Sequence, residues 1–486
     1  MSEQNNAGAP PSLLEPQSRG GDVGEGGINF QAEVVLSFIP KWLRMEGFTS
    51  MLREGMVDTE AMFFVPGRGY RKEAVEVKDH SVIPSKFWAE FDRFKELEAA
   101  APSEYQWFTF AAAGLSQELR PLANGLRRIR DPYAFYEGSA IMDNSYEEYV
   151  RLVKDAGRNE QDADFLFRRV LIDGSLSTAR DHGFALFQYS LQEHLPGFRD
   201  LPGSMLRDVY ADLSAFVKGR RNKPIFRSEL ERVLRNRISE RDLPPPNPVR
   251  IHTAFDELET EADRTALRFA GAHFFGAGPE GCPPPEAWNS RLMGELRETK
   301  DWILKHRQTR RIALTGSRRL SSSLAIGSVF SAVAGFSVEM TYREGTLWAT
   351  DAHAGSDTPD YPIAPDDLSH LAKADRLAVS VGIIRDIAAE VEGSLSLSGL
   401  GDVPTLHIKG GIPLISPQQT NLAVGKIKRL ISGALSITGA RQVDLFFAGP
   451  AFLALFLGHR LNATAPVQCY ERIEPGRYVP TYLLFG

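Results

Sequence analysis

Two cysteines in 486 residues are too few for a disulfide framework, and Cys282 and Cys469 lie too far apart to act as a paired metal ligand. No run of about 18 apolar residues is present, so no membrane-spanning helix and no membrane partner are expected. The first residues lack the apolar core of a secretory signal. The net charge of −6 also excludes a uniformly basic chain, so any nucleic-acid surface must be a local patch. These absences predict a cytoplasmic protein.

The remaining composition is that of a globular protein with more than one core. The hydrophobic content of 43% and charged content of 24% are ordinary, and the length suffices for two or three domains. Residues 1–27 are rich in Gly, Pro, Asn and Ser and are predicted to be disordered. A proline run at 243–248 predicts a linker, because consecutive prolines interrupt helices and strands. We therefore expect one domain over residues 28–241 and another over 250–486.

A predicted hairpin in the first half carries residues suited to catalysis. Apolar and charged residues alternate over 75–78, so Glu76 and Lys78 share one face of a strand. If the hairpin is symmetric about Arg68, Asp58 falls opposite Lys78. Two carboxylates beside a lysine suit phosphodiester hydrolysis assisted by Mg²⁺ or Mn²⁺, with Asp58 and Glu76 as metal ligands. The alternative interpretation is a solvated strand face with a weak surface ion pair.

Beyond residue 311 the pattern changes to alternating strands and helices. Such alternation predicts a Rossmann-like, largely parallel sheet, and two successive series indicate two related halves. Ligands of such sheets bind beyond the carboxyl ends of the strands, where glycines let backbone amides approach a phosphate. We place Arg318 and Lys409 at the carboxyl edge of one sheet. The alternative is a set of ordinary helix-capping turns. The residues predicted to bind a ligand are Gly316, Arg318, Arg319, Ser322, Lys409, Gly449 and Pro450.

The acid and lysine pattern resembles the core motif of the PD-(D/E)xK nuclease superfamily. Gln31 opens an apolar helical stretch where related nucleases carry a glutamine that faces the metal, and residues 54–58 resemble their Glu-x-x-x-Asp segment. The resemblance implies a restriction-endonuclease-like α/β domain that cuts double-stranded DNA. It implies that Gln31, Asp58, Glu76 and Lys78 are the catalytic residues.

Segments 315–327, 447–460 and 467–472, together with Trp348, resemble the SAVED domain. SAVED domains are two fused CARF-like Rossmann units that bind cyclic oligonucleotides in effectors of CBASS antiphage defence. The resemblance implies a cyclic oligonucleotide ligand, a cyclic trinucleotide in our interpretation, that drives homo-oligomerisation. Joined to the first resemblance, it implies a ligand-activated DNA endonuclease.

Two other functions are consistent with the sequence. One is a cyclic-nucleotide sensor whose N-terminal half is a non-catalytic interaction module, and the other is an α/β enzyme that turns over a nucleotide. Basic residues at 218–223 and at Arg127, Arg128 and Arg130 indicate either solvated surfaces or contacts to a DNA backbone. A G-x-G-x-x-G match at 276–281 is excluded as a dinucleotide site, because prolines follow where a phosphate-binding helix should start.

Overall fold

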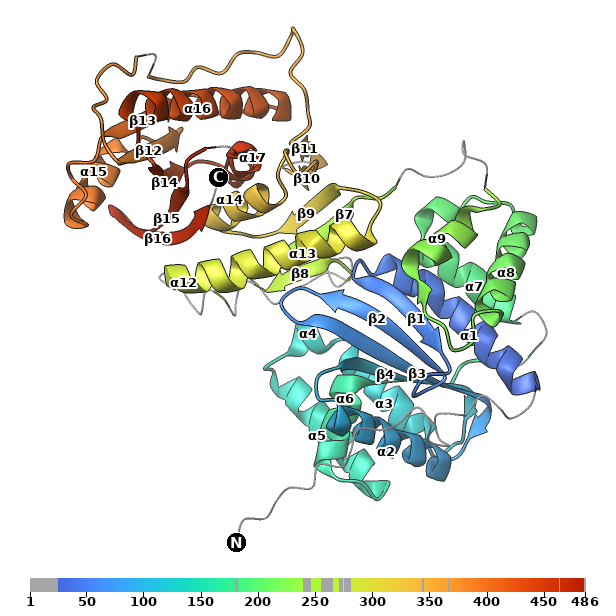
Figure 1. Cartoon of the computed structure of the whole chain (residues 1–486). Coiled ribbons are helices and arrows are strands. Elements are labelled where there is room, and N and C mark those ends of the chain that lie inside the picture. Colours follow the sequence, from blue (N-terminus) through green and yellow to red (C-terminus); the bar gives the residue numbers. More distant parts are fainter. Residues whose placement is uncertain are drawn as a thin grey trace. The chain divides into compact units, whose positions relative to one another are not determined.

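The chain forms two compact units, Met1–Pro245 and Pro246–Gly486 (Figure 1). The computed structural model describes residues 25–177, 179, 182–238, 246–254, 265–270, 274, 281–342, 345–365, 367–462 and 464–484. Residues 1–24, half of the proline run (243–245) and most of the 276–281 match therefore lie outside the described residues, so the predictions made for them stay predictions. Among the described helices, none is both long enough and apolar enough to cross a membrane.

Unit 1 is built on a six-stranded mixed sheet with the order β5-β4-β3-β2-β1-β6. Strands β1, β2 and β3 form an antiparallel meander, whereas β3, β4 and β5 run parallel. The short strand β6 pairs antiparallel with β1 at the far edge. The strands are β1 Phe48–Arg53, β2 Thr59–Val65, β3 Gly69–Val82, β4 Tyr105–Leu115, β5 Val170–Asp173 and β6 Ile225–Phe226.

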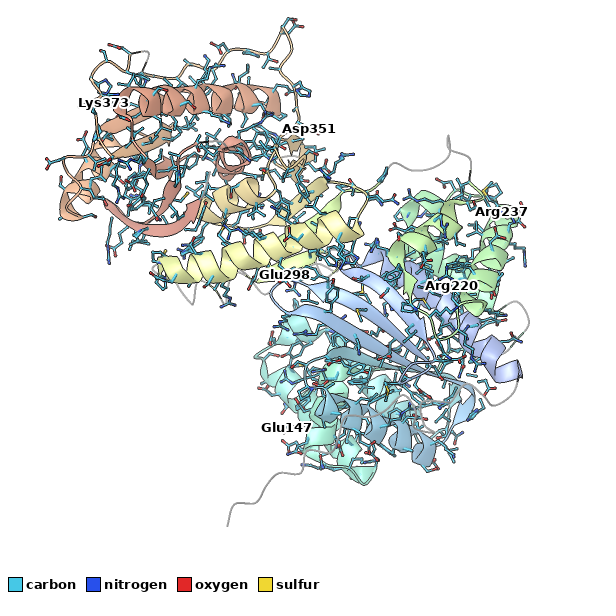
Figure 2. All side chains as sticks on the ribbon, in the orientation of Figure 1. Glu147, Arg220, Arg237, Glu298, Asp351 and Lys373 are labelled. Atoms are coloured by element: carbon cyan, nitrogen blue, oxygen red, sulfur yellow. The ribbon has the colours of Figure 1, made fainter. Side chains whose placement is uncertain are left out.

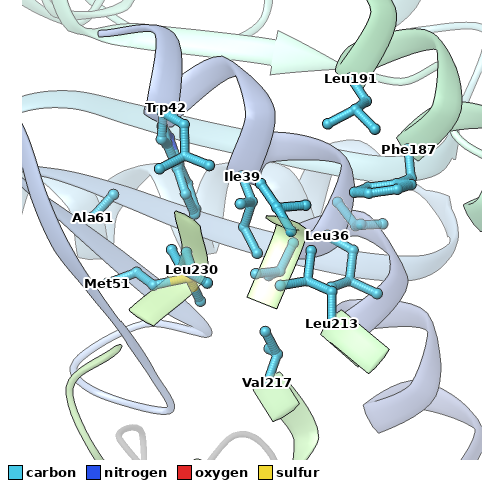
Figure 3. Packing of buried hydrophobic residues seen from close by; sticks show 14 of the residues in the cluster. Leu36, Ile39, Trp42, Met51, Ala61, Phe187, Leu191, Leu213, Val217 and Leu230 are labelled. Atoms are coloured by element: carbon cyan, nitrogen blue, oxygen red, sulfur yellow. The ribbon is translucent and has the colours of Figure 1, made fainter. Parts of the chain in front are cut away.

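Helices cover both faces of this sheet (Figure 1). On one face α1 packs with α7, α8 and α9, and their apolar side chains meet the sheet in a single core (Figure 3). The helices of this layer are α1 Glu25–Arg44, α7 His182–His194, α8 Gly203–Lys218 and α9 Arg227–Arg235, with a short turn of helix at Pro196–Phe198.

The second face carries an aromatic core. Phe87 and Phe94 of α2 contact Phe110 and Phe108 of β4, with ring centroids 5.2 and 5.0 Å apart. Such pairs add stability beyond the area that they bury. This layer consists of α2 Pro84–Ala100, α3 Arg120–Arg130, α4 Tyr133–Tyr136, α5 Ala140–Asp155 and α6 Glu160–Arg169.

Unit 2 contains two five-stranded sheets with the same topology. Their orders are β8-β7-β9-β10-β11 and β13-β12-β14-β15-β16, each with four parallel strands and a final antiparallel strand. This repetition confirms the prediction of two related Rossmann-like halves. The first sheet comprises β7 Val249–Ala254, β8 Leu267–Ala270, β9 Arg311–Gly316, β10 Ser337–Thr341 and β11 Leu347–Ala349. The second comprises β12 Arg376–Ile383, β13 Thr405–Gly410, β14 Gln442–Ala448, β15 Val467–Glu474 and β16 Arg477–Leu484.

The two halves meet through helices that follow equivalent strands. A Cβ added at Gly327 of α14 would lie 2.1 Å from the Leu455 carbonyl oxygen, and one at Gly458 of α17 would lie 2.2 Å from that of Leu324. Each helix thus offers a glycine where the other's backbone approaches, a contact that no larger residue permits. The helices of unit 2 are α12 Pro285–Ala287, a π-helical turn Trp288–Leu292, α13 Met293–His306, α14 Leu320–Val329, α15 Ala388–Leu397, α16 Pro417–Thr438 and α17 Ala451–Arg460.

Candidate functional site

The register of the β2–β3 hairpin decides which side chains meet in unit 1. A three-residue turn with Gly67 at positive φ joins the strands, so Val65 pairs with Gly69 and Thr59 with Val75. The pairing is centred on Gly67. The predicted symmetry about Arg68 was therefore wrong, and Asp58 comes opposite Glu76 rather than Lys78. Because directly opposed residues share a face, Asp58, Glu76 and Lys78 still lie on the same face of the sheet.

Alternation along β3 separates two kinds of buried acid. Glu73 faces α1, where its carboxylate accepts hydrogen bonds from Trp42 Nε1 at 2.9 Å and Thr109 Oγ1 at 2.8 Å. Its hydrogen bonds are therefore satisfied within the core. Glu76 and Lys78 point to the opposite face, toward α2, because side chains alternate along a strand.

On that face, Lys78 bridges the strand and the helix. Its Nζ atom lies 2.7 Å from Glu76 Oε1 and 2.8 Å from Glu90 Oε1. Arg93, one turn after Glu90 on α2, lies 3.8 Å from Glu76 Oε2 and also donates a hydrogen bond to the Met56 carbonyl. The sequence prediction missed Glu90 and Arg93. Their only signal is an i, i+3 charged pair on a helix, which is common on solvated surfaces.

Burial makes this cluster electrostatically unusual. Burial, followed by the negative charge of Glu76, raises the pKa of Asp58 to about 8, although the Val77 N–H donates to Asp58 Oδ2 at 2.8 Å. Burial also raises the pKa of Glu76, against the opposing charge of Lys78. Burial alone lowers the pKa of Lys78, but Glu76 and Glu90 outweigh it and raise the pKa overall. Perturbed carboxylates that share a site are typical of functional sites.

The donor set of the cluster fits a magnesium ion. Glu76 Oε2 is buried and has no hydrogen-bond partner within the described ranges, so a cation would satisfy it. No group of three or more His, Cys, Asp or Glu side chains is arranged as metal ligands in the described parts of the chain. Magnesium sites commonly use only one or two carboxylates and complete their shell with water and substrate phosphates. Asp58 and Glu76 would supply those two carboxylates.

The other predicted residues of unit 1 lie near the cluster to different degrees. Gln31 is half-buried on α1, which packs against the opposite face of the sheet, so its catalytic role stays a prediction. Glu54 lies in the β1–β2 turn with a φ of 58°, and its N–H donates to the Asp58 carbonyl at 2.8 Å. Its carboxylate forms an ion pair with Arg221. The turn that carries Asp58 is therefore fixed by a hydrogen bond within it and by an ion pair to the segment before β6.

In unit 2, Gly316 is the last residue of β9, and Arg318 lies in the turn between β9 and α14. Gly316 has a φ of 83°, and a Cβ there would lie 2.1 Å from the Thr253 carbonyl oxygen, so the turn needs glycine. Arg318 donates to the Gly316 carbonyl at 3.0 Å, and its buried Nε atom has no hydrogen-bond partner among the described residues. Burial lowers the pKa of Arg318 to about 10, which leaves the guanidinium charged at neutral pH.

Two helices begin at the predicted ligand residues. Arg319 and Pro450 occupy the N-cap positions of α14 and α17, and neither side chain caps its helix. Ser322 is buried on α14, and its hydroxyl has no hydrogen-bond partner in the part of the chain that the structure describes. Uncapped N-terminal N–H groups are ready partners for a phosphate. At α14, however, Glu471 already accepts the Ser321 N–H at 3.1 Å.

Lys409 and Gly449 lie at the carboxyl edge of the second sheet. Gly382 of β12 pairs with Lys409 of β13 and with Ala448 of β14, so the three strands end side by side. Lys409 forms an ion pair of 2.7 Å with Asp386. Arg318 follows β9, which belongs to the other sheet. The prediction that Arg318 and Lys409 share one sheet edge was therefore wrong, because the chain builds one sheet for each half.

Comparison with known proteins identifies the second unit. Residues 295–484 match the model of the SAVED family, described as the SMODS-associated and fused to various effectors sensor domain. Residues 295–484 are a SAVED domain. The match begins within α13, so the SAVED model omits β7 and β8, although both strands belong to the first sheet.

Similarity extends over nearly the whole chain. The chain is 25% identical over 475 residues to CD-NTase-associated protein 4 of Moraxella osloensis, covering 97% of this chain and 98% of that protein. It is 24% identical over 479 residues, with the same coverage, to the protein of that name from an Acinetobacter species.

Solved structures show the same fold. The Acinetobacter baumannii Cap4 SAVED/CARF-domain containing receptor with the cyclic trinucleotide 3′3′3′-cAAA has a TM-score of 0.81 at 21% identity, covering 96% of this chain and 100% of that one. The Moraxella osloensis Cap4 receptor has a TM-score of 0.77 at 23% identity, covering 95% and 100%. The mixed α/β fold predicted for this chain, with its SAVED domain, is therefore confirmed.

Proposed function

We propose that this protein is a metal-dependent endonuclease that cuts double-stranded DNA when a cyclic oligonucleotide binds its SAVED domain, and that it acts in CBASS antiphage defence. The observation that carries the proposal is the convergence of Asp58, Glu76 and Lys78 on one sheet face, where the buried Glu76 Oε2 accepts no hydrogen bond from the described residues. A solvated strand face would leave these charges in water. Here Glu76 is only 3% exposed.

Each residue has a chemical task in this proposal. Asp58 and Glu76 would hold a Mg²⁺ or Mn²⁺ ion. Such an ion would polarise the scissile phosphate and lower the pKa of water, so that a nucleophile would form at neutral pH. Lys78, which contacts Glu76 at 2.7 Å, lies where an ammonium can orient the attacking water and stabilise charge on the phosphate. Glu90 restrains Lys78 at 2.8 Å and so limits the positions that its ammonium can take.

For the activating ligand we propose a cyclic trinucleotide. Support comes from the SAVED domain and from a fold shared with a receptor that was solved with 3′3′3′-cAAA. The turns after β9 and β14 provide glycine backbones and helix N-termini, which suit phosphates. The ligand must bind the active assembly more tightly than the inactive one, since only differential affinity shifts an equilibrium. We propose that this assembly is a homo-oligomer.

The Lys78→Ala variant tests the catalytic assignment. We expect cleavage of a supercoiled plasmid, measured with Mg²⁺ and 3′3′3′-cAAA, to fall at least about a hundredfold, as is typical when a charge-stabilising group is removed. Binding of the trinucleotide should not change, because Lys78 belongs to unit 1. Chelation of the metal by EDTA should silence the wild-type protein. Full cleavage by the variant would remove this cluster as the active site. Ligand binding without any wild-type cleavage would instead favour a sensor with a non-catalytic first unit.

A further inference from the structure

One end of the unit 1 sheet brings together segments that are distant in sequence. Arg53 of β1 pairs with Thr59, next to Asp58, and β6 pairs with β1 at Met51, so the chain preceding β6 reaches this end. On the other side, Val77 pairs with Ala111 of β4, which pairs with Asp173 of β5. With about 4.8 Å between strands, β5 lies about 10 Å from β3, and β6 about 15 Å away on the opposite side. The strand ends from β5 to β6 thus form a row about 25 Å long, and the cluster of Asp58, Glu76 and Lys78 lies near its middle.

A basic cleft lies at the β5 end of this row. It encloses about 700 Å³ between α1, α3 and the carboxyl ends of β4 and β5. Its charged lining consists of four cations and two carboxylates: Lys41, Arg120, Arg127, Arg130, Asp131 and Asp173. The excess of positive charge favours an anionic occupant.

Three of the four cations are available to such an occupant. Arg130 is not, because its guanidinium donates to the carbonyls of Leu166, Phe167 and Val170. Arg120 uses only its Nε, which donates to the Leu115 carbonyl at 3.2 Å. Arg127 is exposed, and neither it nor Lys41 forms an ion pair with the described residues. Buried carbonyls thus fix Arg130, while Lys41, Arg120 and Arg127 keep free donors.

The opposite end of the row carries a second group of cations. The loop between α8 and β6 spans residues 219–224, and Arg221 anchors it to Glu54 in the turn that leads to Asp58. Arg220 pairs with Glu229 at 2.9 Å (Arg220 is labelled in Figure 2). Lys218 and Lys223 are exposed and form no ion pair within the described chain. The last residue of α8 and the loop that follows it therefore supply two cations without an ion pair in the described chain, beside the turn that carries Asp58.

We propose that duplex DNA lies across this end of the sheet, with backbone phosphates in the cleft of Lys41, Arg120 and Arg127 and others against Lys218 and Lys223. This inference rests on the proposed endonuclease function. At about 3.4 Å per base pair, a row of about 25 Å matches roughly seven base pairs centred on the metal site. Phosphate contacts of this kind give affinity and orientation without sequence preference. A duplex is favoured because cations flank the cleavage site on both sides.

Binding of a fluorescein-labelled 30-base-pair duplex, followed by anisotropy in EDTA, tests the proposal without cleavage. We expect Arg127→Ala, Lys41→Ala and Lys223→Ala each to weaken binding about fivefold to tenfold, and to reduce the slope of log K against log salt concentration by about 0.9 per lost contact. Arg128→Ala is the matched control, since Arg128 follows Arg127 on α3 and is also exposed but does not line the cleft. Its affinity and slope should equal those of the wild type.

The outcomes separate this inference from the function on which it rests. Unchanged affinity and slope in the cleft and loop variants, with wild-type cleavage intact, would overturn the DNA path but not the endonuclease. Loss of duplex binding in those variants, with no wild-type cleavage in Mg²⁺ and 3′3′3′-cAAA, would support the binding surface and overturn the endonuclease. Displacement of the duplex by a stoichiometric single-stranded RNA or acidic peptide would overturn the choice of duplex DNA.

Discussion

Replacing Asp58 by asparagine should stabilise unit 1 while it abolishes cleavage. Asp58 is 9% exposed and lies opposite Glu76, and its pKa is raised to about 8. In the unfolded chain an aspartate has a pKa of about 3.9. Because the folded-state pKa is the higher one, folding favours the protonated form. The stabilisation from this group is complete below about pH 4 and is lost as the pH rises toward 8.

The size of the effect follows from this shift. A difference of about four pKa units corresponds to an upper bound of about 5–6 kcal/mol above pH 8, at 1.36 kcal/mol per unit. Part of the shift comes from the charge of the neighbouring Glu76, so we expect Asp58→Asn to gain only about 2–4 kcal/mol at pH 8. An asparagine oxygen can still accept the Val77 N–H, which lies 2.8 Å from Asp58 Oδ2. In a unit of this size the gain raises the melting temperature by about 5–15 °C.

Scanning calorimetry in EDTA between pH 4 and pH 8 measures this prediction. The difference in melting temperature between Asp58→Asn and the wild type should grow with pH. In a second set of scans with Mg²⁺ in place of EDTA, only the wild type should melt at a higher temperature, because ligands stabilise the state that binds them. Asp79→Asn is the control, since Asp79 lies on β3, the strand that carries Glu76, but is exposed. A variant that melts at or below the wild-type temperature at every pH would show that folding does not raise the pKa of Asp58.

Two further predictions concern unit 2. Gly458→Ala should lower the free energy of unfolding of unit 2 by about 1–3 kcal/mol or more, because the new Cβ would lie 2.2 Å from the Leu324 carbonyl oxygen. The control is Gly425→Ala, in an open position on α16, which should stabilise unit 2 by about 0.5–1 kcal/mol. Equal denaturant midpoints for the two variants would contradict the contact between α14 and α17. Lys409→Ala should raise the half-maximal concentration of 3′3′3′-cAAA about tenfold or more, as expected for a lost charged hydrogen bond. Arg441→Ala, at the amino end of the same sheet, should leave that concentration unchanged. Equal half-maximal concentrations for the Lys409 and Arg441 variants would show that the ligand does not contact Lys409.

The local pattern of the sequence determined the elements and the chemistry that they carry. Alternation over 75–78 predicted that Glu76 and Lys78 share a strand face, because the side-chain period of a strand is a backbone property. The alternating strands and helices beyond residue 311 likewise predicted two Rossmann-like halves, since parallel strands need crossover helices. Glycines marked the turns for the same reason: Gly316 has a φ of 83°, which other residues rarely adopt.

Tertiary structure decided the contacts between elements. The turn geometry at Gly67 shifted the hairpin so that Asp58 faces Glu76, an arrangement that composition alone does not specify. Packing of α2 brought Glu90 to Lys78, and the separation of unit 2 into two sheets parted Arg318 from Lys409. The same holds for the raised pKa of Asp58, because desolvation depends on what covers a side chain. Residue spacing sets which groups share a face, but only the packed fold sets how far they lie from each other and from water.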